Sequence, residues 1–221
     1  MVKAIFTDFY GTVVHEDGEV IKKITQEIYA TGKVKDISEI GSYWWNEFQT
    51  AFNSAFDENF ETQRELEYRS LEKTIRHFNS SADAKALSER MFEHWIKPPA
   101  FEETKRFFEL CPVPVYIVSN IDRDDVLQAI KYHDLTLTGV FTSEDARAYK
   151  PRKELFELAL KKAGLPAENV LHIGDSISSD IKGAMSVGIN AIWVNRSNRE
   201  VPQNVTAVRN MLEVFDTEYF H

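Results

Sequence analysis

Short apolar runs and longer amphipathic stretches alternate along most of the chain. Residues 2–7 form an apolar, β-branched-rich run, and comparable runs lie at residues 113–118, 139–142, 170–173 and 191–194. Continuous apolar runs of this length are typical of strands that are buried on both faces of a sheet. Stretches with apolar residues three or four positions apart separate the later runs and predict helices. The predicted helices lie at residues 101–110, 124–133, 151–164, 181–187 and 205–215.

This alternation indicates an α/β fold with a Rossmann-like parallel sheet and helices on both of its faces. For the helix at residues 151–164, we expect Pro151 in the first turn and Gly164 after the end. The opening run belongs to the same sheet, although a long helical segment separates it from the other strands.

That segment, residues 20–96, carries four amphipathic stripes and no strand pattern. Asp36 and Thr62 are each followed three residues later by an acid, which is typical of helix starts. Four helices without strands bury their apolar faces against one another. The stripes are Val20, Ile21, Ile24 and Ile28; Ile37, Ile40, Trp44, Phe48, Phe52 and Phe56; Leu71, Ile75 and Phe78; and Leu87, Met91 and Trp95.

Turn and breaker signals delimit this helical segment. Asp17-Gly18 predicts a short hairpin or loop before it, and Pro98-Pro99 ends it. We therefore expect a smaller helical-bundle domain at residues 16–98, inserted into a core made of residues 1–15 and 99–221.

Charge and cysteine content narrow the class of protein. The 221 residues carry a formal net charge of −9 without basic runs, which argues against a nucleic-acid partner. The single cysteine, Cys111, precedes an apolar strand, where we expect it to pack in the core. The first apolar run is too short for a signal peptide, and no stretch reaches membrane-span length. We expect a soluble cytoplasmic protein with no membrane partner, as a monomer or homodimer.

Polar residues follow three of the predicted strands directly. Asp8, Ser119-Asn120 and Asp175 stand at these strand ends, and Lys150 precedes a helix between the last two. The carboxyl ends of parallel strands meet at one edge of the sheet, so we expect these groups to converge. Paired carboxylates favour Mg²⁺, and aspartate is a nucleophile for phosphoryl transfer when cations offset the charge of the phosphate.

Together these segments resemble the four motifs of the haloacid dehalogenase superfamily. Residues 8–12 resemble the nucleophile motif, Ser119-Asn120 the second, Lys150-Pro151 the third and residues 174–180 the acidic fourth. Order and spacing match over nearly the whole chain. The helical insertion lies where this family places its cap domain.

The resemblance implies a role for each matching residue. Asp8 corresponds to the nucleophile, and Lys150 bridges Asp8 and the transferred group. Magnesium ligation is implied for Asp8, the Tyr10 backbone carbonyl, Asp175 and Asp180, and contact with the transferred group for Thr12, Ser119, Asn120 and Lys150.

Tyr10 departs from the family pattern. Family phosphatases usually carry a second aspartate at this position, as general acid and base. A phenol with a pKa near 10 donates a hydrogen bond but is a poor base at neutral pH. We expect Tyr10 to act in catalysis within this limit; the alternative is that it only packs under the cap.

Three functions remain open from the sequence. The leading one is a magnesium-dependent phosphatase of a small phosphorylated metabolite, acting through an aspartyl-phosphate on Asp8. The second is a metal-independent 2-haloacid dehalogenase, which Tyr10 favours. Such dehalogenases carry a cap arginine after a tryptophan; Trp44-Trp45 offers none, which leaves Arg64 or Arg69 as substitutes. The third is a family member that binds a phosphorylated ligand or a protein partner with little turnover.

Overall fold

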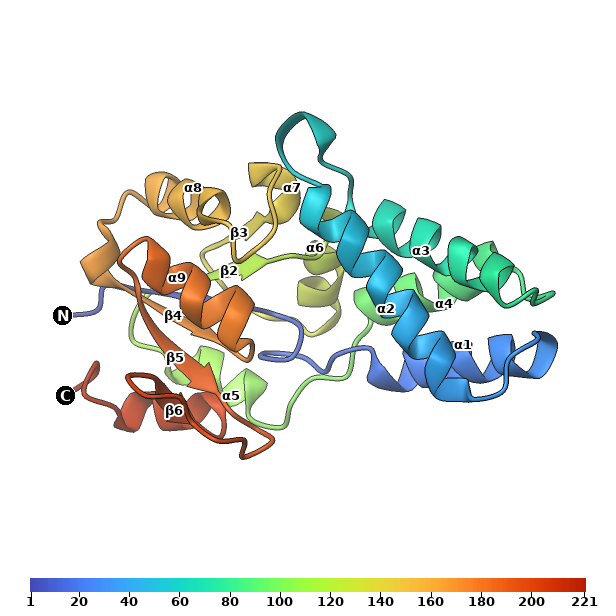
Figure 1. Cartoon of the computed structure of the whole chain (residues 1–221). Helices are drawn as coiled ribbons and strands as arrows, with labels where there is room; N and C mark the ends of the chain where they lie inside the picture. Colours follow the sequence, from blue (N-terminus) through green and yellow to red (C-terminus); the bar gives the residue numbers. More distant parts are fainter.

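The computed structural model describes residues 1–221 and contains one six-stranded parallel sheet (Figure 1). The strand order is β3-β2-β1-β4-β5-β6, so β1 lies at the centre, between β2 and β4. The strand order reverses beside β1, and this switch point is where open α/β sheets place their ligands. The strands are β1 (Ala4–Thr7), β2 (Val115–Ser119), β3 (Gly139–Thr142), β4 (Val170–Gly174), β5 (Asn190–Val194) and β6 (Thr206–Val208).

Helices cover both faces of the sheet because successive strand residues point to opposite sides. Ile5 faces the cluster that includes residues of α5, α6 and η4, whereas Phe6 faces the cluster that includes residues of α8, α9 and η3. The predicted α/β fold class is confirmed. The core helices are α5 (Thr104–Leu110), α6 (Arg123–Tyr132), α7 (Ser143–Ala146), α8 (Lys153–Ala163), η2 (Ala167–Asn169), η3 (Ile177–Lys182), α9 (Gly183–Ser186) and η4 (Met211–Asp216).

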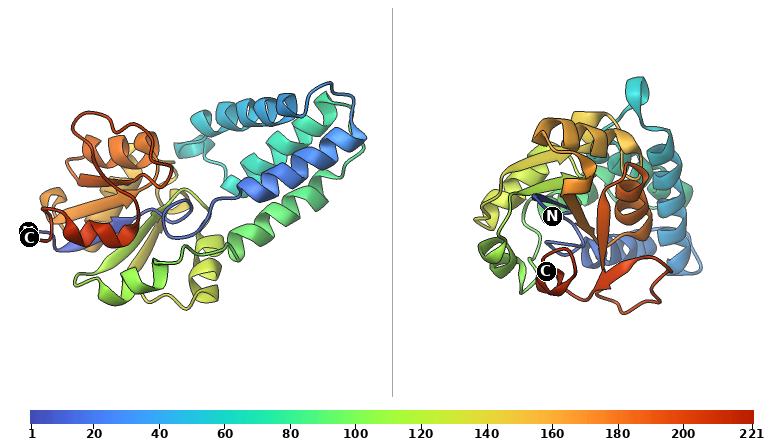
Figure 2. Two further views of the ribbon diagram at one scale, coloured as in Figure 1. Left: turned by 90° about the horizontal axis from the view of Figure 1, so that it is seen from below. Right: turned by 90° about the vertical axis from the view of Figure 1, so that its left-hand side faces the viewer.

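Four further helices pack against one another and project from the sheet as a bundle (Figure 2). The predicted starts are correct: Asp36 caps α2 by accepting from the Ser38 N–H, and Thr62 forms a capping box with Glu65. Both chain termini lie at the opposite end of the molecule from the bundle (Figure 2). The bundle helices are α1 (Gly18–Thr31), α2 (Ile37–Ser54), α3 (Gln63–His77) and α4 (Ala84–Ile96), with a short turn of helix at η1 (Asp57–Asn59).

The chain enters and leaves the bundle at neighbouring points. Val14 and Ala100 form an antiparallel bridge, and the His15 N–H donates to the Pro99 carbonyl at 2.8 Å. The bundle is therefore an insertion whose two connections to the core lie side by side. Its helices lie within the predicted segment 16–98, and the domain limits at residues 15 and 98 stay a prediction.

Several local predictions were wrong. The predicted helix at residues 205–215 is instead β6 followed by the short η4, because β-branched Val205, Thr206 and Val208 suit a strand and β5 offers an edge to pair with. Pro151 precedes α8 rather than lying in its first turn. Of the two alternatives at Asp17-Gly18, the loop is correct: residues 15–17 form no hairpin and lead directly into α1, which begins at Gly18.

Among the helices of the structure, none combines the length and the apolar composition that a membrane span requires.

Candidate active site

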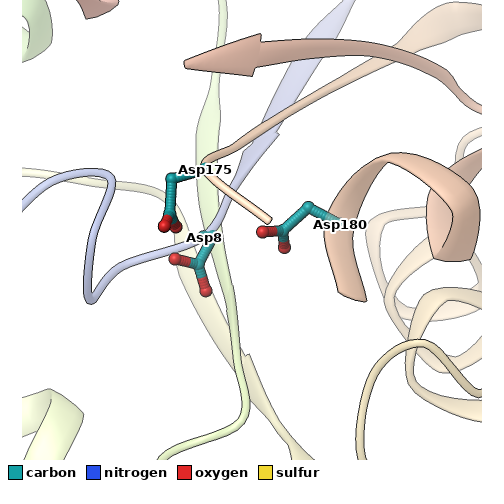
Figure 3. Close-up of side chains that lie close together, drawn as sticks. All are labelled: Asp8, Asp175 and Asp180. Atoms are coloured by element: carbon teal, nitrogen blue, oxygen red, sulfur yellow. The ribbon is translucent and has the colours of Figure 1, made fainter. Parts of the chain in front are cut away.

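Three carboxylates face one another beyond the carboxyl end of the central strands (Figure 3). Asp8 directly follows β1, Asp175 directly follows β4, and Asp180 lies in the π-helical turn η3. One oxygen of each lies within 4.8 Å of the others. The predicted convergence of Asp8 and Asp175 therefore follows from the pairing of β1 with β4.

Two glycines make room for this close approach. A Cβ on Gly11 would stand 2.6 Å from the Asp175 carboxylate, and Gly11 also has a φ of +95°, which side-chain-bearing residues rarely adopt. A Cβ on Gly174 would overlap the Asp180 side chain. A glycine at each position is thus a condition for the acidic cluster.

Lys150 contacts two of the three carboxylates. Its Nζ donates to Asp8 Oδ1 and Asp180 Oδ1, both at 2.7 Å, and to the Val118 carbonyl at 2.8 Å. The residue is 1% exposed. Thr12 Oγ1 lies 3.2 Å from Asp8 Oδ2 and 3.1 Å from Asp175 Oδ1, so it lies between the two carboxylates. Asp8, Thr12, Lys150, Asp175 and Asp180 form one connected site.

Burial and charge set the protonation of the acids. Burial raises the pKa of Asp8 to about 6, although Lys150 opposes the rise. Burial and the neighbouring Asp8 and Asp180 raise the pKa of Asp175 to about 8. Burial also acts on Asp180, but Lys150 and His172 hold its pKa well below the usual range. The site therefore has more negative charge than Lys150 alone offsets.

His172 and Ser176 hold Asp180 in place. The His172 ring lies fully buried with Nε2 3.1 Å from Asp180 Oδ1, and the Ser176 N–H donates to Asp180 Oδ2 at 3.0 Å. Burial lowers the pKa of His172. His172 is therefore a packed, hydrogen-bonded neighbour of Asp180.

The second motif reaches the same cavity, with its side chains turned to the protein. Asn120 Oδ1 accepts from the Lys150 N–H at 2.7 Å, and Asn120 Nδ2 donates to the Lys150 carbonyl at 3.2 Å. Ser119 Oγ accepts from the Ile121 N–H at 3.2 Å. Asn120 thus fixes the backbone of the catalytic lysine candidate. Contact of Ser119 and Asn120 with a transferred group stays a prediction.

The Tyr10 hydroxyl is turned toward the bundle. It donates to the Trp95 carbonyl, near the end of α4, at 2.5 Å. Burial, followed by the nearby Asp125 and Asp8, holds the pKa of Tyr10 far above its ordinary value. The phenol therefore keeps its proton and uses it in a contact between core and bundle, which favours the packing role over acid–base chemistry.

The donor set fits magnesium. Asp8, Asp175 and Asp180 offer oxygen ligands only, which a hard divalent cation prefers over nitrogen or sulfur ligands. Asp175 accepts a hydrogen bond from Thr12 but forms no ion pair, and burial beside Asp8 and Asp180 raises its pKa. A divalent cation would supply a positively charged partner.

A cavity of about 690 Å³ connects this site with the bundle. Lys150 is its only basic lining residue. Arg64, one candidate for binding a substrate carboxylate, instead pairs with Asp125 through two bonds of 2.7 and 2.5 Å. Arg69 pairs with Glu61 at 2.6 Å. Neither arginine lines the cavity.

Two groups of residues escaped prediction. The first is Asp122, which directly precedes α6 and whose carboxylate accepts from the Gln63 and Arg64 N–H groups at the start of α3. Asp17 and Glu67 line the cavity from the bundle side. In the sequence, an acid on an amphipathic helix cannot be distinguished from one that faces solvent. No local pattern therefore predicted that Glu67 lines the cavity.

The comparison with protein families decides the assignment. A family model described as haloacid dehalogenase-like hydrolase matches residues 2–188. The chain belongs to this family. It is a hydrolase of the haloacid dehalogenase superfamily, as its four motifs predicted.

Relatives within the superfamily have different activities. The (S)-2-haloacid dehalogenase of Pseudomonas fluorescens is 26% identical over 225 residues, covering 96% of this chain and 93% of that protein. Pyrimidine 5'-nucleotidase YjjG of Escherichia coli is 34% identical over 77 residues. That match spans 34% of each chain, so this chain aligns with only about a third of the nucleotidase.

Solved structures show the same fold at low identity. The L-2-haloacid dehalogenase from Xanthobacter autotrophicus, with chloropropionic acid covalently bound, gives a TM-score of 0.76 at 16% identity and covers 97% of each chain. The putative HAD-hydrolase YfnB from Bacillus subtilis, bound to magnesium, gives 0.76 at 19% identity with the same coverage. Both kinds of neighbour share the fold over 97% of this chain, a share that extends to the bundle as well as the core.

Proposed function

We propose that this hydrolase is a magnesium-dependent phosphatase of a small phosphorylated metabolite, with Asp8 as nucleophile. One observation carries the proposal: three carboxylates lie within 4.8 Å, while Lys150 is the only basic residue in a cavity otherwise rich in acids. An anionic phosphoryl group needs more positive charge than Lys150 provides. The same carboxylates would hold the cation that provides it.

The chain's own residues account for the steps of the reaction. Asp8, with a pKa near 6, is ionised at neutral pH, and Lys150 and Thr12 fix its two oxygens. An Asp8 oxygen forms a bond to phosphorus as the bond from phosphorus to the leaving alcohol breaks. Water then cleaves the aspartyl-phosphate. The leaving oxygen gains one proton and the attacking water loses one, so an ester and water give an alcohol and phosphate.

Magnesium would be held by Asp8, Asp175, Asp180 and the Tyr10 backbone carbonyl. When bound, it supplies positive charge that offsets the repulsion between nucleophile and phosphate. Lys150 adds a second, fixed positive charge beside Asp8.

Tyr10 limits the range of efficient substrates. Its proton is engaged with the Trp95 carbonyl, so it does not serve the leaving group. The loss of such help costs about 10²–10⁴-fold in rate. We therefore expect aryl phosphates, whose phenolate leaves without a proton, to react faster than simple alkyl phosphates.

A metal-independent 2-haloacid dehalogenase is the second candidate. Tyr10 favours it, because a departing halide needs no acid, and the relative from Pseudomonas fluorescens aligns over 96% of this chain. The cavity lining opposes it. A haloacid carries a carboxylate, yet Arg64 and Arg69 are paired elsewhere and six acids line the cavity.

Hydrolysis of p-nitrophenyl phosphate, with Mg²⁺ or with EDTA, tests the proposal. We expect turnover only with Mg²⁺, and loss of at least about 10³-fold in Asp8→Asn. Asp124→Asn, which changes an exposed acid on α6, is the matched control and should retain activity. Chloride release from 2-chloropropionate in EDTA, without phosphatase activity, would overturn the proposal in favour of the dehalogenase. Tight binding of phosphate esters without turnover of either substrate would favour the weakly active alternative.

A further inference from the structure

The half of the cavity that faces away from Asp8 is both aromatic and acidic. Rings of Trp44, Trp45, Phe48, Phe52 and Trp95 line it, together with the carboxylates of Asp17 and Glu67. No lysine, arginine or histidine of the bundle contributes to the lining. These two acids would repel an anionic group and would attract a cation more strongly than a neutral hydrogen-bond donor.

Glu67 is the least compensated of these acids. It is 9% exposed, on the inner side of α3, and forms no ion pair. The indole N–H of the neighbouring Trp44 donates to Ser70 Oγ at 3.2 Å and also lies close enough to the Glu67 carboxylate to lower its pKa. Burial, followed by the charge of Asp17, outweighs this effect and raises the pKa of Glu67 to about 8. A buried carboxylate without a cationic partner is costly, and an incoming cation would reduce that cost.

The aromatic side chains supply the second half of a cation site. Trp45 is 61% exposed and stacks on Phe48 with centroids 6.2 Å apart, and Phe48 in turn lies 5.6 Å from Phe52. The faces of such rings attract ammonium groups, most strongly where water is excluded. An acid and several aromatic rings around one cavity are how proteins bind substituted ammonium ions.

We propose that this half of the cavity binds a positively charged amine on the leaving group, so that the substrates are phosphate monoesters of amino alcohols. The assignment rests on the proposed phosphatase function, which places the phosphate at Asp8. Glu67 and the tryptophan rings then contact the amine. The charge of the ammonium group also stabilises the departing alkoxide, which partly offsets the absence of a general acid at Tyr10.

A pair of esters of equal shape tests the charge preference. Choline phosphate carries a quaternary ammonium, and 3,3-dimethylbutyl phosphate replaces its nitrogen by carbon. With Mg²⁺, we expect kcat/KM to be about tenfold or more higher for choline phosphate. Glu67→Gln should remove most of this preference, chiefly by lowering kcat/KM for choline phosphate. Glu89→Gln, an exposed change on α4, is the matched control.

Equal kcat/KM for the two esters in the unmodified protein would overturn the inference, as would an equal loss for both in Glu67→Gln. Binding measured without turnover separates this failure from that of the phosphatase proposal. Choline and 3,3-dimethylbutanol are titrated while the fluorescence of the three cavity tryptophans is followed. Tighter binding of choline, weakened in Glu67→Gln, supports the cation site even when no ester is hydrolysed. Equal binding of the two alcohols overturns it.

Discussion

Tyr10 occupies the position at which the phosphatases of this family usually have a second aspartate. Its hydroxyl reaches the Trp95 carbonyl rather than the space beside Asp8. The Tyr10 hydroxyl therefore links the core to the bundle. The reaction has to proceed without a side-chain general acid at this position. The presence of a tyrosine at this position already predicted the lack of a general acid or base. In the structure the hydroxyl also points away from Asp8, toward the bundle.

Tyr10→Phe removes that hydrogen bond and little else. We expect activity on p-nitrophenyl phosphate to stay within about threefold, and unfolding free energy to fall by about 1 kcal/mol, a typical value for one buried hydrogen bond. Steady-state kinetics and urea unfolding measure the two effects. A loss of a hundredfold in kcat with unchanged stability would instead show that the phenol acts in catalysis.

The acids of the site make magnesium binding depend on pH. Asp175, with a pKa near 8, has to lose its proton before it ligates a metal, and Asp8 follows with a pKa near 6. Below these pKa values the carboxyl groups of Asp175 and Asp8 are protonated, so protons compete with Mg²⁺ for the same oxygens. We expect the apparent affinity for Mg²⁺ to fall about tenfold per pH unit below pH 8, and more steeply below pH 6.

Calorimetry between pH 5.5 and 8.5, in buffers of different ionisation enthalpy, measures both affinity and proton release. Release of close to one proton at pH 7 is expected. Asp175→Asn should bind Mg²⁺ weakly and with much less dependence on pH. Affinity that does not change over this range would contradict the assignment of Asp175 as a ligand.

Among single residues, those at strand ends were predictable and those on the bundle were not. Asp8, Ser119 and Asp175 follow apolar runs directly, so the parallel sheet alone places them together. Glu67 and Asp122 owe their surroundings to packing between bundle and core. Neighbours in such packing are far apart in sequence, and no local pattern records them.

At the scale of elements, the start of α3 anchors the bundle to the core through hydrogen bonds and an ion pair. Thr62 caps the helix from within the bundle, whereas Asp122 of the core accepts from its first two N–H groups at 2.8 and 2.9 Å. Arg64 then pairs with Asp125 in α6, a residue that is 1% exposed. These contacts hold the start of α3 in the bundle against the start of α6 in the core.

Asp122→Ala removes the two backbone hydrogen bonds without disturbing the capping box. We expect a loss of about 1–2 kcal/mol in unfolding free energy. We also expect a several-fold rise in KM for p-nitrophenyl phosphate, because Asp122 holds Gln63 of α3, which lines the cavity. Thermal unfolding and kinetics measure these effects, with the exposed Asp124→Ala as control. Unchanged stability and KM would show that the anchor lies elsewhere.

Elements with strong periodicity were predictable, and elements that depend on a neighbour were not. The four bundle helices and five of the strands were expected from spacing alone. Residues 206–208 form β6 only because β5 presents an open edge. Similarly, α8 begins beyond Pro151 because Asn120 holds the backbone of Lys150 in the site.

At the scale of the molecule, the bundle is joined to the core by two short segments, residues 14–17 and 97–99. With Mg²⁺ and orthovanadate, a phosphate analogue, we expect the bundle to close over the cavity and the radius of gyration in solution scattering to fall. Mg²⁺ alone is the control. Identical scattering curves with and without vanadate would show that the molecule is rigid.

The bridge between Val14 and Ala100 brings together the two points at which the chain passes between core and bundle. The chain leaves the core and returns to it at adjacent points, so the path of the sheet does not depend on what lies between them. The segment between these two residues, which forms the bundle, can therefore be exchanged as a unit, in evolution or by protein engineering. The reaction centre would be inherited unchanged, while the walls of the cavity, and with them the molecules admitted, would be replaced in one step.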